Sequence, residues 1–196
     1  MTKMKRDDAM ISTDIWLPQM QQQIFRGLLD AFSYPGRIST CAGRSTPAWL
    51  ATLSALVDGE TTLADPQQML SAEWWQKLEA RRAPQEMAAF ILLKGRHAPE
   101  LIPNIGTLEA PETGATLLLR VNSLHSDLTG DVRLGLSGPG IRQQVSMSVS
   151  GLHPAWITSR NEWVAAFPLG VEMVLCDAHN YMALPRTTQI VMGVAA

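Results

Sequence analysis

The stretch that decides the fold is "MAAFILLK", residues 87–94. Its apolar run continues without polar interruption for the length of a strand, and it is too short for a buried helix. A continuous run of this kind is typical of a strand that is covered on both faces. Lys94 closes the run, and we expect it to be a charge that ends a hydrophobic strand rather than a Schiff-base lysine. The stretch therefore predicts a buried strand of an α/β domain.

Helical and strand-like patterns alternate on both sides of this stretch. Residues 19–32 place Met20, Ile24, Leu28 and Phe32 at four-residue spacing, which gives a helix one apolar stripe. Further helices are expected at 46–59, 71–82 and 154–167, and further strands at 37–41, 61–64, 115–122, 131–136, 141–149, 171–177 and 181–184. Helices and strands that intermix in this way predict an α/β fold with a mixed sheet.

Local signals mark the ends of two of these helices. Thr46 is the candidate N-cap of the second helix, with Pro47 in its first turn and Gly59 after it. Ser71 is the candidate N-cap of the third. The polar residues 1–14 are expected to be a flexible segment, and residues 15–196 to form one α/β domain.

Composition and charge exclude several classes of protein. The net charge is −2 and the basic residues are scattered, which argues against binding to nucleic acid. No apolar run is long enough to cross a membrane, and no secretory signal is visible, so we expect a cytoplasmic protein. Cys41 and Cys176 are expected to be buried free thiols, with a long-range disulfide as the alternative.

Motifs for common catalytic chemistry are absent from the sequence. The four histidines are too widely spaced for a metal pair on a helix, and none has a cysteine at zinc-ligand spacing, so we expect no metal site. There is no G-x-S-x-G elbow, no G-x-x-x-x-G-K-[ST] loop and no G-x-G-x-x-G that opens a helix.

The glycine-rich stretch "LSGPGI", residues 136–141, has two interpretations. Gly138 and Gly140 could form a small anion-binding nest, or they could serve a tight turn that needs a positive φ. The residues that follow alternate like a strand, so no helix dipole points at the loop, and we favour the turn.

Two arginines are candidates for binding an anion. Arg37 follows a Pro-Gly turn, and Arg186 follows a proline at the end of a strand, next to Thr187. Guanidinium and hydroxyl groups at strand ends bind phosphate or carboxylate oxygens well. An arginine that holds its own loop or a partner's carboxylate would show the same pattern, and the sequence leaves both interpretations open.

Four segments in this order resemble the PhnH family, the H subunit of the bacterial carbon–phosphorus lyase system for phosphonate use. They are "FRGLLDAFSYPGRI", "APETGATLLLRV", "LSGPGI" and "FPLGVEMVLCDAHNYMALPRTT", and together they run from Phe25 to Thr188. The positions that match the family's turns and its last strand end are Pro35, Gly36, Gly138, Gly140, Pro185, Arg186 and Thr187. The resemblance carries over no catalytic residue.

The resemblance implies a subunit that works in the cytoplasm with sister subunits G, I, J, K and L. With G, I and L it implies a part in transferring the ribose triphosphate moiety of ATP to a phosphonate, with release of adenine. The product from methylphosphonate is ribose 1-methylphosphonate 5-triphosphate. It also implies a three-layer αβα sandwich similar to the large domain of pyridoxal-phosphate-dependent transferases, but without that cofactor.

The role of this chain within such an assembly has two interpretations. It could contribute directly to the transfer site, with Arg37 and Arg186 among the groups that hold ATP or the phosphonate. It could instead be an accessory subunit whose surfaces, including some of the six tryptophans, hold its partners in place. Because no general acid, base or nucleophile is evident, we favour the second for the chain alone, and we expect a homodimer in isolation.

Overall fold

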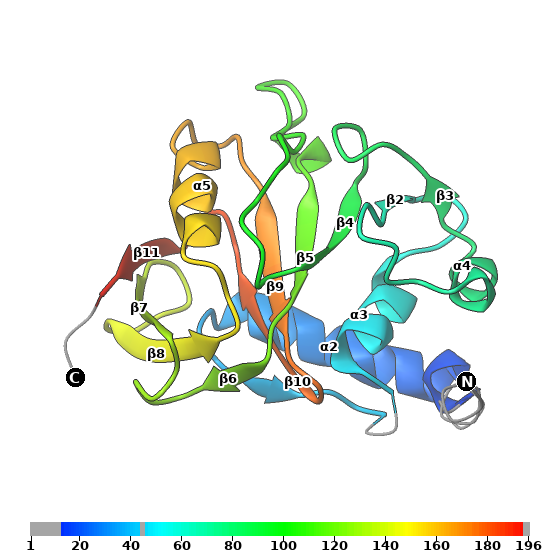
Figure 1. The fold of residues 1–196 in the computed structure, drawn as a ribbon, viewed down its shortest axis with the longest axis horizontal. Helices are drawn as coiled ribbons and strands as arrows, with labels where there is room; N and C mark the ends of the chain where they lie inside the picture. The colour runs from blue at the N-terminus through cyan, green and yellow to red at the C-terminus, as the bar shows by residue number, and fades with distance from the viewer. Residues whose placement is uncertain (1–12, 44–45, 194–196) are drawn as a thin grey trace.

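A seven-stranded mixed sheet forms the centre of the protein (Figure 1). The computed structural model describes residues 13–43 and 46–193. In spatial order the strands are β1 (Ser39–Thr40), β10 (Asn180–Leu184), β9 (Glu172–Cys176), β5 (Thr116–Arg120), β4 (Phe90–Lys94), β2 (Thr62–Ala64) and β3 (Arg81–Arg82). The five strands from β9 to β3 are parallel, whereas β10 pairs antiparallel with β9 on one side and with β1 on the other.

A second, four-stranded sheet is antiparallel throughout. Its spatial order is β11 (Gln189–Met192), β7 (Val132–Ser137), β8 (Val145–Ser150) and β6 (Ser123–His125). Three of these strands, β6, β7 and β8, lie between β5 and β9 in the chain, and β11 joins them after β10.

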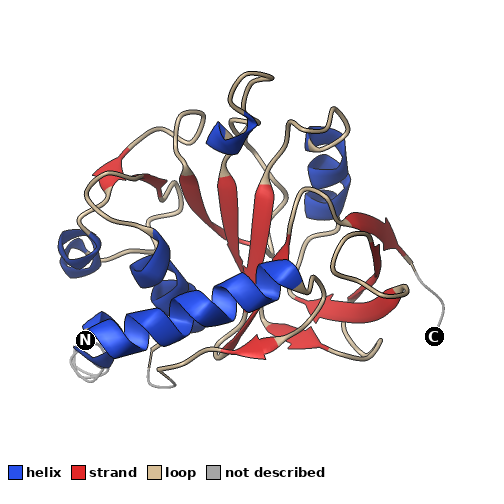
Figure 2. Cartoon of the chain, turned by 180° about the vertical axis from the view of Figure 1, so that it is seen from behind, coloured by secondary structure: helices blue, strands red, loops and turns tan. Residues whose placement is uncertain are grey.

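Within residues 13–43 and 46–193, four α-helices flank the seven-stranded sheet, together with two short 3₁₀ helices. They are α2 (Pro18–Ser33), α3 (Ala48–Leu56), α4 (Ala72–Leu78) and α5 (Ala155–Trp163), with η2 (Thr13–Trp16) and η3 (Pro111–Thr113). Figure 2 shows the long helix α2 lying across the sheet. Pro18 suits its first turn, and the expected apolar stripe is buried at Ile24 and Leu28.

Side chains of the central strands alternate between two cores. On β4, Leu92 packs with residues of α2, α3 and α4, whereas Ile91 and Leu93 pack with the four-stranded sheet and α5. The same alternation holds on β5, where Leu118 shares the core of Leu92. Residues 87–94 therefore include a strand covered on both faces, as predicted.

The predicted α/β class with a mixed sheet and four helices is confirmed. On one face of the seven-stranded sheet the layer is helical, as expected. On the other face α5 shares the layer with the four-stranded sheet, whose residues Leu134 and Val149 join the core there. The hairpin predicted between 171–177 and 181–184 is also present as β9 and β10.

The third predicted helix, 71–82, was too long. Ser71 caps it as expected, and its Oγ accepts from Trp74 N at 3.3 Å. The helix ends at Leu78, and Glu79 has a φ of 57°. The segment is rich in helix-forming residues, so the local propensity favoured continuation. Pairing of Arg81–Arg82 with β2 overrides that propensity.

Other boundaries also differ from the prediction. Helix α5 ends at Trp163 rather than at 167, and β3, β6 and β11 were not predicted. Thr46 is not the N-cap of α3: that position is Pro47, which makes no side-chain cap bond. Of the segment expected to be flexible, residues 1–12 lie outside the described residues.

Both cysteines are free and buried, as predicted. Burial raises the pKa of the Cys41 thiol to about 11 and raises the pKa of the Cys176 thiol further. In the described part of the chain, no helix combines the length and apolar character that a membrane span requires.

Candidate anion site at the carboxyl edge of the sheet

Two cations end neighbouring parallel strands of the sheet. Lys94 is the last residue of β4 and pairs in register with Arg120, the last residue of β5, which in turn pairs with Cys176 of β9. Leu92 and Leu118 face the helical core two residues earlier, so the alternation of strand side chains directs Lys94 and Arg120 to that same face. The carboxyl edge of parallel strands is where open α/β sheets bind ligands.

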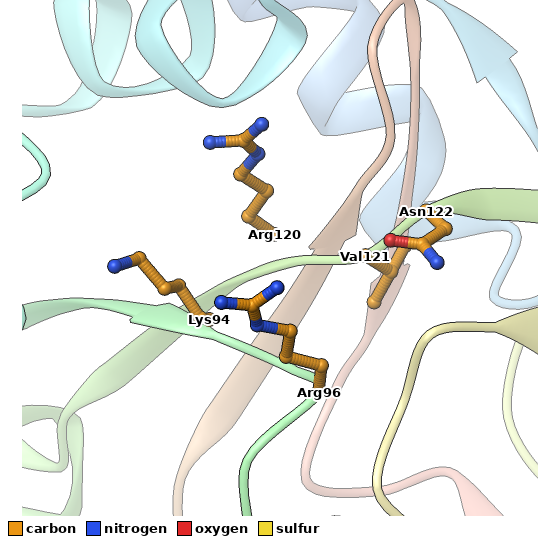
Figure 3. Close-up of a pocket in the computed structure, with 5 residues that line it drawn as sticks. All are labelled: Lys94, Arg96, Arg120, Val121 and Asn122. Atoms are coloured by element: carbon orange, nitrogen blue, oxygen red, sulfur yellow. The ribbon is translucent and has the colours of Figure 1, made fainter.

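A third cation completes a basic pocket at this edge. The pocket has a volume of about 260 Å³, and its wall is formed by Lys94, Arg96, Arg120, Val121 and Asn122. Figure 3 shows the three basic side chains around one hollow, with the guanidinium group of Arg96 turned back towards the strands. We call these five residues the basic pocket.

No acidic partner neutralises the basic pocket within the described residues. The ion pairs found there join Lys77 to Glu73, Arg81 to Glu60 and Arg186 to Glu172. Arg96 Nε lies 3.1 Å from Nε2 of the neighbouring His97, and none of the described carboxylates lies within ion-pair distance of the three cations. Like charges on neighbouring strands repel one another, so this arrangement costs free energy that a bound anion would recover.

Backbone contacts hold the strand ends that carry these cations. Lys94 N donates to Gln67 Oε1 at 2.5 Å, and Gly95 N donates to Arg120 O at 2.8 Å. A Cβ atom on Gly95 would lie 3.2 Å from that same carbonyl oxygen, so the glycine allows β4 and β5 to remain close where β4 ends. Lys94 and Arg120 are thus held at the ends of paired strands, and Arg96, Val121 and Asn122 follow directly in the connecting segments.

A larger cavity adjoins the basic pocket and shares Arg120, Val121 and Asn122 with it. Its volume is about 590 Å³. The remaining wall comes from the start of α3 and from the β9–β10 turn, through Thr46, Pro47, Trp49, Asp177, Ala178 and His179. We call this space the adjoining cavity.

The one carboxylate in the wall of the adjoining cavity is already saturated by hydrogen bonds. Asp177 is buried and accepts from Leu124 N at 3.2 Å, from His179 N at 2.9 Å and from Asn180 N at 2.7 Å. The Nδ2 atom of Asn180 donates to it as well. Its role is to hold the β9–β10 turn, and it is not a free general base.

The structure places Arg186 at the opposite edge of the sheet. Its Nε lies 2.5 Å from Oε1 of Glu172, the first residue of β9. Its Nη1 donates to Pro111 O at 2.6 Å and to Pro168 O at 3.0 Å. These contacts are those of an arginine that ties loops together, which is one of the two interpretations the sequence left open. Arg37 is exposed.

The other predicted site residues meet in a contact between turns. Gly138 has a φ of 128°, and a Cβ atom there would lie 2.9 Å from the carbonyl oxygen of Thr187. Gly140 has a φ of 80°, and its Cβ atom would collide with the carbonyl oxygen of Ser33 and stand 2.9 Å from Pro35 Cδ. Positive φ and close backbone approach together explain both glycines, in agreement with the turn interpretation of "LSGPGI".

Sequence reasoning missed the basic pocket as a site. Lys94 was interpreted only as a charge that ends a strand, and Arg120 was not singled out. A usable signal existed, because two buried apolar runs, "FILLK" and "TLLLR", each end in a cation. Parallel strands that end alike bring such residues to one edge of a sheet.

Comparisons with known proteins match most of the length of this chain. The family model described as "Bacterial phosphonate metabolism protein (PhnH)" matches residues 14–191. The "Putative C-P lyase subunit protein HtxG" of Stutzerimonas stutzeri is 43% identical over 176 residues, which cover 90% of this chain and 88% of that protein. The "Alpha-D-ribose 1-methylphosphonate 5-triphosphate synthase subunit PhnH" of Rhizobium meliloti (strain 1021) is 29% identical over 182 residues, covering 86% of this chain and 89% of the relative. Since the model spans nearly all of the sequence, the chain belongs to the PhnH family of bacterial phosphonate metabolism proteins.

Proposed function

We propose that this chain acts with the G, I and L subunits of a carbon–phosphorus lyase assembly. In that role it takes part in transferring the ribose triphosphate moiety of ATP to a phosphonate, with release of adenine. The relative from Rhizobium meliloti is named as a subunit of such a synthase, which supports the reaction class. The observation that carries the proposal is the basic pocket, with Lys94 and Arg120 side by side and unneutralised.

The chemistry of the basic pocket suits a phosphorus oxyanion. Phosphonates and the triphosphate of ATP are both strongly anionic, and the groups that bind such oxygens best are guanidinium and ammonium groups. Arg96 and Arg120 supply planar donors, and Lys94 supplies a compact charge. On this proposal Lys94 binds an anion and forms no Schiff base, and the chain carries no pyridoxal phosphate.

The proposed part of this chain is to position substrate. The basic pocket contains no carboxylate and no histidine, and Asp177 beside it is saturated. Donors placed around a polyanion hold it in a reactive position and stabilise charge during transfer. Proton transfer would then fall to a partner subunit.

The test is calorimetric titration of inorganic tripolyphosphate into the purified protein. Arg120→Gln removes one pocket charge and should weaken binding at least tenfold, since a charge-assisted contact is lost. Arg133→Gln is the matched control, because Arg133 is also an exposed strand arginine but lies on β7 in the other sheet. Equal losses in the two variants would mean nonspecific attraction and would contradict the proposal.

A second experiment, an activity assay, addresses the reaction itself. The assembly with the G, I and L subunits is reconstituted, and adenine release from ATP is followed in the presence of methylphosphonate. Arg120→Gln should slow release at least tenfold while the assembly keeps its mass. Full activity in this variant would leave the chain without a part in the transfer site.

A purely structural role in the assembly is the second candidate function. Phe25 and Leu29 lie one turn apart on α2 and are 45% and 52% exposed, and Tyr34 beyond the helix is 52% exposed. Exposed apolar side chains that gather on one element are typical of protein–protein contacts. The tryptophans support this role less, since Trp74 is buried and Trp75 is stacked under Arg82.

We further propose that the protein is a cytoplasmic homodimer when isolated. A subunit surface made for partners often pairs with its own copy when those partners are missing. Sedimentation at micromolar concentration tests this, and a monomer there would contradict it. Phe25→Ser combined with Leu29→Ser distinguishes whether α2 forms the contact, because this variant should then sediment as a monomer.

A further inference from the structure

We infer that the basic pocket and the adjoining cavity form one two-part site for a nucleoside triphosphate, with the phosphates in the first part and the nucleoside in the second. This inference rests on the proposed function and deepens it. A phosphonate or a bare phosphate would need only the basic pocket. The adjoining cavity gives the site a second part of different chemistry.

The two parts share a wall, so one ligand can occupy both. Arg120, Val121 and Asn122 line each of them. Arg120 rises from the end of β5 towards the helical side of the sheet (Figure 3), and its guanidinium group stands where phosphate and sugar would meet. A ligand that crosses this position would contact Lys94 and Arg96 at one end and α3 at the other.

The two parts also differ in volume, and the part proposed for the nucleoside is the larger one. The basic pocket, at about 260 Å³, suits phosphate groups, whereas the adjoining cavity is about 590 Å³. Cavities of roughly 300–1,000 Å³ are the usual range for small-molecule sites. A nucleoside needs the larger of these two spaces.

The wall of the adjoining cavity is suited to a sugar and a base. Pro47, Trp49 and Ala178 provide apolar and aromatic surface, while Asn122 and His179 provide hydrogen-bonding groups. Such a mixture of apolar walls with a few polar groups is typical of sites for uncharged organic ligands. Asp177 fixes the backbone of His179, so this part of the wall is held in place before any ligand binds.

An unpaired hydroxyl group points to a ligand at the start of α3. Thr46 is 2% exposed, and its Oγ1 has no hydrogen-bond partner among the described residues. The helix that follows has Pro47 at its N-cap and makes no side-chain cap bond. Buried polar atoms are nearly always paired in native proteins, so a hydroxyl of this kind in a cavity wall calls for a partner that is a ligand group or an ordered water. A sugar hydroxyl or a base edge would pair with it.

The experiment compares ATP with inorganic tripolyphosphate by calorimetry, with the chain alone and in the assembly with its G, I and L partners. ATP should bind at least tenfold more tightly, because only ATP fills the adjoining cavity. Thr46→Val keeps the shape of the side chain and removes a hydroxyl that is unpaired in the free protein. The variant should have a folding stability equal to or above that of the parent. Its affinity for ATP should fall about threefold to tenfold, the usual range for one hydrogen bond.

Tripolyphosphate provides the internal control, since Thr46→Val and His179→Ala should leave its affinity unchanged. If tripolyphosphate binds the parent as tightly as ATP and requires Arg120, the anion site stands and this inference fails. If ATP and tripolyphosphate both fail to bind in either setting, the proposed function fails with it. If methylphosphonate binds better than ATP and competes with it, the inference is overturned as well.

Discussion

Lys94 and Arg120 occupy the same register position on the neighbouring parallel strands β4 and β5. Both face the helical side of the sheet, where Cys176 is the next residue in the row. Two positive charges at adjacent positions repel one another, and no carboxylate in the described residues relieves the repulsion. Sites at which a local rule is broken in this way are commonly functional.

Removing one of these charges should stabilise the free protein. Arg120→Gln relieves the repulsion, so the free energy of unfolding should rise by about 0.2–1 kcal/mol at low ionic strength. The gain should shrink at high ionic strength, because salt already screens the charges of the parent. Urea unfolding of both proteins at the two ionic strengths measures the difference, with Arg133→Gln as the control. A loss of stability at low ionic strength would show that Arg120 is paired in solution.

Replacing Arg186 should destabilise the fold and leave anion binding at the other edge intact. The ion pair with Glu172 is mostly buried, with 12% and 23% of the two side chains exposed. Arg186→Ala removes the side-chain donors to Glu172 Oε1, Pro111 O and Pro168 O, and the carboxylate keeps only the backbone N–H of residue 186, so the loss should be roughly 3 kcal/mol. Arg186→Lys keeps the charge but cannot reproduce the planar set of donors. Its free energy of unfolding should lie between those of the parent and Arg186→Ala.

Urea unfolding and tripolyphosphate titration together decide the role of Arg186. The opposite pattern, with unchanged stability and lost binding, would move Arg186 into the ligand site.

Two glycines form a matched pair for testing the turn interpretation of "LSGPGI". A Cβ atom on Gly140 collides with the backbone of Ser33, whereas nothing lies within 4 Å of a Cβ atom on Gly59. Gly140→Ala should therefore cost about 2–4 kcal/mol, from strain at positive φ and displaced backbone. Gly59→Ala should fall within about 1 kcal/mol of the parent and can stabilise it. Thermal unfolding measures both. A stable Gly140→Ala variant that had lost anion binding would favour the interpretation of this loop as an anion-binding nest.

Alkaline pH should weaken the fold through its buried acidic groups. Burial raises the pKa of Cys41 to about 11 and that of Tyr181 to about 12. The unfolded chain ionises these groups first, near pH 9 and 10, so it binds fewer protons than the native state above those values. These two groups should add no pH dependence below about pH 8.5, and their contribution to stability should decline as the pH rises through 11, by up to about 1.4 kcal/mol per pH unit for each group.

Urea unfolding at a series of pH values tests this decline. Cys41→Ala should show a shallower dependence on pH than the parent, whatever its stability at neutral pH. An unchanged slope would assign the decline to other groups.

Much of the fold could be predicted from sequence because its central strands are long apolar runs. Residues 87–94 and 115–122 are covered on both faces, and a continuous run records that coverage directly. Strands β3 and β6 span only Arg81–Arg82 and Ser123–His125, which is too short for any periodicity to appear. At Glu79 the local sequence favours continuation of helix α4. The helix ends there because the next residues, Arg81–Arg82, pair with β2.

The candidate site was harder to predict than the fold, for a physical reason. Lys94 and Arg120 become neighbours only through the order of strands in the sheet, which no local pattern records. Arg186 has good anion-binding chemistry by residue type, but its partners Glu172 and Pro111 are known only once the loops are placed. Residue type therefore suggested the right chemistry, and topology decided which residues are free to perform it.

The order of strands in the two sheets determines when the chain can fold during its synthesis. Strands β9 and β10 complete the large sheet, and β1 near the start of the chain pairs only with β10, while β11 completes the small sheet against β7. Neither sheet can close until residues 172–192 have been synthesised and have left the exit tunnel. Contacts of such long sequence separation form slowly, so β5, paired with β4, waits for its other partner strand β9 until the last part of the chain has been made. Both sheets therefore close late in synthesis, and we expect chaperones to have their longest access to the chain before residues 172–192 emerge.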